Sequence, residues 1–199
     1  PERIRSGTRA SLDREERIIK ETLLRMASLI EERIRLTIEA LETHDAAQAL
    51  TVIEGDAEIN ALQAEALDHI IRTIATQAPV ARDLRFLLTL DHIACELERI
   101  GDSIANVAKR VRDVAPHAPL AEYVGIPEMG RLAARILADV GRALVDSDVS
   151  VARAVASQDD AIDAHYHRVT DELIRLGQAD PANVERAARL QAKKAELAQ

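Results

Sequence analysis

The chain has 199 residues, of which 47% are hydrophobic but only 2% aromatic, and its net charge is −8. This acidity argues against nucleic acid as the main partner, because binding a phosphate backbone requires concentrated Lys and Arg. No apolar run approaches the roughly 18 residues of a membrane span, and no signal peptide is recognised. The single cysteine, Cys95, excludes an intramolecular disulfide. We therefore expect a cytoplasmic, all-α protein with a core of Ala, Leu, Ile and Val.

Helical periodicity predicts three long helices in the first part of the chain, at about 11–42, 46–76 and 81–114. The first two are separated by a break at 43–45, and the next two by 77–79, which contains a proline that cannot continue a helix. The apolar positions predicted to face inward on the third helix are Leu84, Leu87, Leu88, Ile93, Leu97, Ile100, Ile104, Val107 and Val111.

The segment 116–127 holds three of the six prolines and is predicted to connect two halves of the chain. Beyond it, periodicity predicts helices at about 127–145 and 149–176, and a sixth helix from 181 to the end.

The two halves are related in sequence. A shift of about 103 positions, without a gap, superimposes Met26 on Met129 and Asp45 on Asp148. Asp56, Asp68 and Arg72 also meet identical residues, which helical periodicity alone does not explain. We predict two tandem, sequence-related three-helix bundles with spectrin-repeat-like packing. The predicted division is 1–115 for the first bundle, 116–127 for the connector and 128–199 for the second bundle.

The third predicted helix carries polar oxygens at i, i+4 and i+8, from Glu98, Asp102 and Asn106. On a helix of about 3.6 residues per turn these side chains share one face. Such a row can hold a hard divalent or trivalent ion. The alternative is a solvated acidic face, in which Arg99 forms a salt bridge with Asp102.

Two further residues favour a site. Asp91 lies two turns before Glu98 and extends the acidic row. Gly101 sits in mid-helix at a cost of about 1 kcal/mol relative to Ala, which indicates that something approaches the backbone closely.

The helix start at Arg82 and Arg85 has two interpretations. These arginines flank Asp83 in the first turn, where they either face solvent or dock a partner protein through their guanidinium groups.

The sequence offers little support for catalysis. It has no phosphate-binding Gly-x-x-x-x-Gly-Lys-Ser/Thr loop, no His-Glu-x-x-His and no Cys-x-x-Cys. The strongest enzyme alternative, a ferritin-like di-iron oxidase, requires Glu-x-x-His motifs, and none of the six histidines has a glutamate three positions before it.

Three segments together resemble the signature of the PhoU family: 77–85, 97–102 and 106–108. This resemblance implies a PhoU-like pair of bundles and a cytoplasmic, non-enzymatic regulator of phosphate uptake. Such a protein is an adaptor between the ATPase of the phosphate ABC transporter and a sensor histidine kinase, and represses the phosphate-starvation response when phosphate is plentiful. The resemblance also implies a homodimer that reaches the membrane only through its partners.

The same resemblance implies a metal site, for iron, zinc or another divalent or trivalent ion. Its ligands would be Glu98 and Asp102, facing Asp56 and Asn60 on the neighbouring helix, with Asn106 a weaker candidate. The weaker counterparts in the second bundle are Asp159 and Asp163. Their partners would fall near residue 200, so the last helix is expected to be shortened or incomplete in the given sequence. The alternative function is a carboxylate-rich metal-binding or metal-storage protein.

Overall fold

The computed structural model describes residues 2–117, 125–146 and 148–179, and these ranges contain helices but no strand. This confirms the predicted all-α class. The helices are α1 (Glu2–Thr43), α2 (Ala46–Gln77), α3 (Ala81–Val114), α4 (Ile126–Asp146), α5 (Val149–Ala156) and α6 (Asp159–Ala179). No helix in the described ranges is long and apolar enough to cross a membrane.

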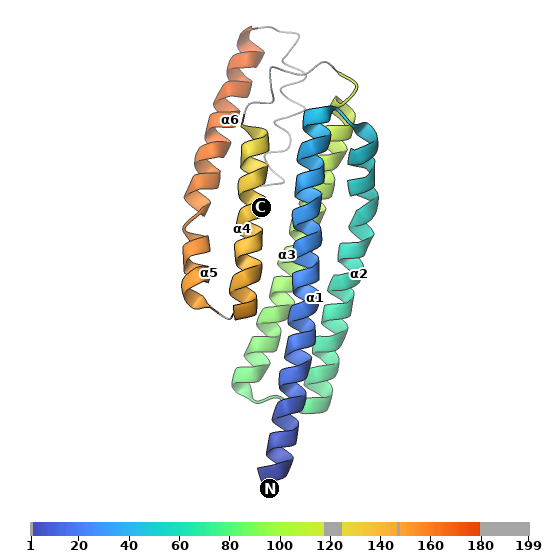
Figure 1. Cartoon of the computed structure of the whole chain (residues 1–199), viewed down its shortest axis with the longest axis vertical. Coiled ribbons are helices and arrows are strands. Elements are labelled where there is room, and N and C mark those ends of the chain that lie inside the picture. The colour runs from blue at the N-terminus through green and yellow to red at the C-terminus, as the bar shows by residue number, and fades with distance from the viewer. Residues whose placement is uncertain (1, 118–124, 147, 180–199) are drawn as a thin grey trace.

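The long helices α1, α2 and α3 pack side by side as an antiparallel bundle (Figure 1). Helix α4 runs along α1, and α5 and α6 pack on α4. On α1, Ile19, Leu23, Met26 and Ile30 have no exposed surface and recur every three or four residues. Burying each such side chain contributes about 1.5–3 kcal/mol, so this stripe orders the first bundle.

The same helix cap occurs twice, 103 positions apart. The carboxylate of Asp45 accepts hydrogen bonds from the backbone N–H groups of Ala47 and Gln48, both at 2.9 Å. Asp148 accepts equivalent bonds from Ser150 and Val151, at 2.8 and 3.3 Å. Both aspartates have extended φ and ψ angles, which is the conformation of an N-cap. The sequence repeat is therefore a structural repeat at these two positions.

Small residues allow α4 to approach α1 closely. A Cβ added to Gly130 would lie 2.5 Å from Ile38 Cδ1, and one added to Gly141 would lie 3.6 Å from Leu24 Cδ2. Leu137, also on α4, is buried in the core that α1, α2 and α3 share. The first bundle and α4 are therefore held by common apolar packing.

Several sequence predictions need correction. Helix α1 begins at Glu2 and not near residue 11, because residues 2–10 contain no proline that would end the helix. The predicted helix 149–176 is two helices, since α5 ends at Ala156 and α6 begins at Asp159. The predicted helix from 181 onward lies outside the described residues.

Two inward-facing assignments on α3 are also wrong. Leu88 and Ile100 are 53% and 39% exposed. The buried face of α3 follows Leu87, Leu97 and Gly101, and the residue immediately before or after a buried one is turned away by about 100°. The division into 1–115, 116–127 and 128–199 stays a prediction.

Candidate functional site

Asp56 of α2 and Asp102 of α3 are neighbours across the two helices, close enough for one carboxylate to accept a hydrogen bond from the other carboxyl group when that group is protonated. Gly101 brings the two helices together, because a Cβ at this position would lie 2.8 Å from Ile59 Cδ1. The close approach to the backbone that the sequence indicated is thus made by a core side chain of α2. Packing between α2 and α3 then sets the two aspartates opposite each other.

The electrostatics of this pair are unfavourable in the absence of a cation. Burial and the charge of Asp102 raise the pKa of Asp56, while Arg33 and Lys109 partly offset the rise. Burial, followed by the charges of Asp102 and Asp56, raises the pKa of Glu98 as well. The three carboxyl groups therefore form one repelling cluster, which a bound cation would stabilise.

One buried atom of the cluster lacks a hydrogen-bond partner. Asp56 Oδ1 is inaccessible to solvent and accepts no hydrogen bond from the described residues. An unsatisfied buried carboxylate oxygen is costly and is the kind of donor that a hard cation binds.

Arg33 of α1 is the nearby buried cation, and sequence analysis missed it. Its side chain is only 9% exposed, pairs with Glu58 at 3.2 Å and lies against Gly55, where an added Cβ would be 2.9 Å from Nη2. Its charge lowers the pKa of Asp56. A signal existed in the sequence, since a charged residue directly before Ile34 interrupts the apolar stripe of α1.

The predicted amide ligands Asn60 and Asn106 are not directed at the aspartate pair by any hydrogen bond among the described residues. Asn60 is exposed on α2. Asn106 Oδ1 accepts a hydrogen bond from Lys109 Nζ at 2.9 Å. Arg99 forms an ion pair with Glu96 at 3.1 Å and, through its charge, lowers the pKa of Glu98.

The described residues do not assemble a complete metal-binding geometry. No group of three or more His, Cys, Asp or Glu side chains within them is placed to hold a metal ion. The carboxylate oxygens of Asp56 and Asp102 are the type of ligand that a hard cation binds. Among the described residues, however, no third His, Cys, Asp or Glu side chain is placed to complete the coordination. Metal binding by Glu98, Asp102, Asp56 and Asn60 therefore stays a prediction.

The weaker residues of the second bundle are not brought into a site. Asp163 is exposed on α6, and the side chain of Asp159 lies outside the described residues. Their predicted role stays untested.

Arg82 and Arg85 are both exposed near the start of α3, whereas Asp83 between them is buried. Asp83 lies in the first turn, where a negative charge is favoured by the helix dipole. The arginines are therefore accessible to a partner.

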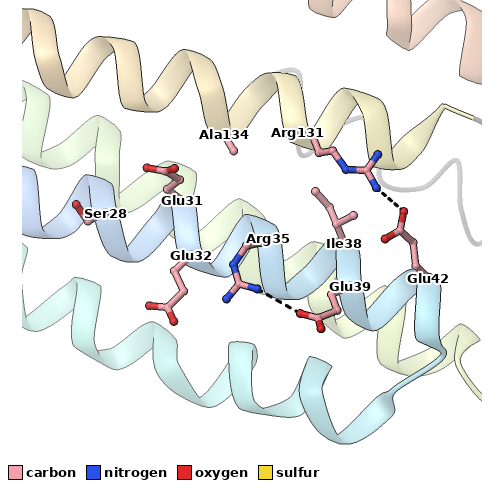
Figure 2. Close-up of a pocket in the computed structure, with 9 residues that line it drawn as sticks. All are labelled: Ser28, Glu31, Glu32, Arg35, Ile38, Glu39, Glu42, Arg131 and Ala134. Carbon is pink, nitrogen blue, oxygen red and sulfur yellow. Dashed lines mark hydrogen bonds and ion pairs between the residues drawn. The ribbon is translucent and has the colours of Figure 1, made fainter.

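A separate groove of about 640 Å³ lies along α1 and α4, away from the aspartate pair (Figure 2). Two of its carboxylates are already neutralised, because Arg35 pairs with Glu39 at 3.4 Å and Arg131 with Glu42 at 2.6 Å. The lining residues are Ser28, Glu31, Glu32, Arg35, Ile38, Glu39, Glu42, Arg131 and Ala134.

Comparison with known proteins identifies relatives over most of the chain. The sequence model of the PhoU domain matches residues 23–111 and 126–193. The two matches begin 103 residues apart, which is the spacing of the internal repeat.

Among curated proteins, the "Phosphate-specific transport system accessory protein PhoU homolog" of Aquifex aeolicus is 34% identical over 86% of this chain and 77% of its own length. The protein of the same name from Clostridium acetobutylicum is 34% identical over 81% of this chain and 74% of its own. The crystal structure of PhoU from Pseudomonas aeruginosa superimposes with a TM-score of 0.86 at 26% identity, covering 93% of this chain and 89% of that one. The crystal structure of the phosphate transport system regulatory protein PhoU from Streptococcus pneumoniae superimposes with a TM-score of 0.79, also at 26% identity, and the match covers 94% of this chain and 91% of that one.

Proposed function

This chain belongs to the PhoU family, and from that premise we propose that it is a phosphate-transport-associated regulator. Its finer role is that of a non-enzymatic adaptor between the ATPase of the phosphate ABC transporter and a sensor histidine kinase. It represses the phosphate-starvation response when phosphate is plentiful, and it works in the cytoplasm as a homodimer. The observation that carries the proposal is the pair of PhoU-domain matches within one chain that superimposes on PhoU crystal structures.

The proposal is supported by the names of the relatives, which describe accessory proteins of phosphate-specific transport. The exposed Arg82 and Arg85 offer guanidinium groups for docking, because their forked N–H donors recognise carboxylates well.

The adaptor role is tested by retention of two purified proteins on this immobilised chain. The probes are the transporter ATPase and the cytoplasmic part of the kinase, each in phosphate-rich and phosphate-free buffer. We expect both to be retained, and we expect Arg82→Ala with Arg85→Ala to weaken at least one complex. Failure to retain either protein in both buffers would contradict the adaptor role.

As a second candidate function, we propose that Glu98, Asp102, Asp56 and Asn60 bind a divalent or trivalent metal ion. Support comes from the unpartnered Asp56 Oδ1 and from the repulsion between Asp56 and Asp102. Iron or zinc is the expected ion, and every donor is an oxygen.

Metal binding is tested by elemental analysis of protein prepared without chelator. Wild type should contain metal, and Glu98→Gln with Asp102→Asn should lose it. Equal, low metal content in both proteins would contradict metal binding and would show that the acidic face is only solvated. If cells are grown at different metal concentrations and phosphate signalling stays unaltered, storage or sensing of metal is the better description of this protein's function.

A further inference from the structure

An exposed apolar patch lies on the outer face of α2 and α3. Its members are Leu67 and Ile71 on α2, which are 42% and 56% exposed, and Leu88 on α3, which is 53% exposed. Because Leu67 and Ile71 are four residues apart, they lie on the same face of α2. We call these three residues the α2–α3 patch.

Three contacts fix the register of the two antiparallel helices. They pair Asp56 with Asp102, Ile59 with Gly101, and Gln63 with Cys95, whose Nε2 and Sγ atoms are 3.7 Å apart. About two turns from Gln63 and Cys95 toward the connecting turn, the same register brings Ile71 level with Leu88.

The patch continues into an acidic strip along α3. Asp91 follows Leu88 by three residues and is half-buried, and neither it nor Glu98 has an ion-pair partner among the described residues. Asp102 lies one turn beyond Glu98. An apolar surface is thus followed along one helix by three negative charges.

None of the described helices covers this surface. Helix α4 packs on α1, and α5 and α6 pack on α4, so these three helices lie across α1 from α2 (Figure 1). Exposed apolar patches bordered by charge are typical of sites that bind other proteins.

We propose that the α2–α3 patch and its acidic strip dock an amphipathic, basic helix of a partner protein. The partner's apolar residues seat on Leu67, Ile71 and Leu88, and its Lys or Arg residues approach Asp91 and Glu98. Charge complementarity selects this occupant, because the carboxylates of the strip attract Lys and Arg side chains but would repel the same strip of a second copy if this face paired with itself. The inference rests on the proposed function, since the partner is one of the two proteins named there.

The test compares affinities for the purified transporter ATPase and for the cytoplasmic part of the kinase. Ile71→Gln with Leu88→Gln should weaken one complex at least about tenfold, as loss of a central apolar contact does. The matched control is Val149→Gln with Ile174→Gln, two apolar residues of α5 and α6 that are 64% and 45% exposed. This control should bind like wild type.

Charge is tested separately with Asp91→Lys, which should weaken the same complex most strongly at low salt. Its control is Asp171→Lys, at an exposed position on α6. Thermal unfolding of every variant must match wild type, so that weakened binding is not due to misfolding.

The outcomes separate this inference from the adaptor role. If wild type binds a probe and the patch variants bind equally well, the docking surface is wrong and the adaptor role stands. If wild type binds neither probe, both proposals fail. If wild type is a dimer by light scattering and the Ile71→Gln, Leu88→Gln protein is a monomer, the patch is covered by a second copy, which overturns the proposed occupant.

Discussion

Helix α2 and the α5–α6 pair occupy equivalent places in the two repeats, yet they differ in continuity. Both begin after an aspartate N-cap, at Asp45 and Asp148. Helix α2 then runs unbroken for 32 residues, whereas α5 ends after eight. The interruption falls at Ser157 and Gln158, and the equivalent of Gln158 in α2 is Gly55, which lies against the buried Arg33.

The difference follows from the neighbours of each helix. Helix α2 packs on both α1 and α3, whereas in the described part of the chain α5 and α6 pack mainly on α4. Helix α6 also reaches the first bundle through Val169, which joins the buried apolar cluster of Leu41 and Val111. Local sequence therefore determines where a helix starts, and tertiary packing determines whether it continues. The first bundle should accordingly dominate stability, and α4 should depend on its contact with α1.

The largest effect is expected in the core of the first bundle. Leu87→Ala should cost about 2–5 kcal/mol, because this side chain is fully buried. The neighbouring Leu88→Ala is a matched control and should change stability by less than about 0.5 kcal/mol, since its side chain is half exposed. Urea unfolding measures both, and equal losses would contradict the assigned face of α3.

Gly130→Leu should separate α4 from α1. The new side chain would meet Ile38, and overpacking of this kind costs about 1–3 kcal/mol. By hydrogen exchange, amides of α4 to α6 should lose protection while those of α2 and α3 keep it. Arg135→Leu, on an exposed position of α4, serves as the control. Uniform loss across all helices would show that the two halves unfold as one unit.

The repeated caps should respond alike. Asp45→Ala should cost about 1 kcal/mol, as removal of an N-cap typically does. Asp148→Ala should destabilise α5 in the same way. The hydroxyl of Ser150, followed by the N–H groups of Ser150 and Val151, lowers the pKa of Asp148.

The lowered pKa of Asp148 gives this cap a pH dependence. Its contribution is fully present above the ordinary pKa of about 3.8 and is lost as pH falls through the lower folded value. Thermal melts between pH 2 and 7 should therefore show the Asp148→Ala difference shrinking in acid. A difference that is constant with pH would argue against the carboxylate as the cap.

The smallest effect is expected at Asp56, with the opposite sign. Burial and, after it, the charge of Asp102 raise the pKa of Asp56 in the folded protein. The charged carboxylate therefore destabilises the folded state at pH values above this raised pKa, and the destabilisation disappears as the pH falls and the carboxyl group is protonated. Asp56→Asn should thus raise the melting temperature of chelator-treated protein at pH 7 by no more than about 3 °C, with the gain vanishing near pH 4. The exposed Asp163→Asn is the control, and a destabilised Asp56→Asn protein would contradict the repulsion.

Periodicity and the internal repeat predicted α2, α3 and α4 to within about two residues at their ends. They could not predict the break at Gln158, because it depends on packing that local sequence does not encode. Leu88 was misplaced for a related reason, since two adjacent leucines fit a helical stripe equally well until the facing helix selects one of them.

The aspartate pair was partly predictable. The family resemblance implied that Asp56 faces the row that contains Asp102, and the structure brings these two carboxyl groups together. Neither the sequence nor the resemblance revealed that Gly101 accommodates Ile59, or that Arg33 is buried nearby. Both depend on contacts between helices that are distant in the chain.

The proposed repression of the phosphate-starvation response is tested most directly by a phosphate-starvation reporter in a bacterium from which this gene has been deleted. In phosphate-rich medium the reporter should be active in the deletion strain, and expression of this chain should return it to the repressed level. A reporter that is repressed without the gene, or that stays active when the folded protein is present, would contradict the proposed negative regulation.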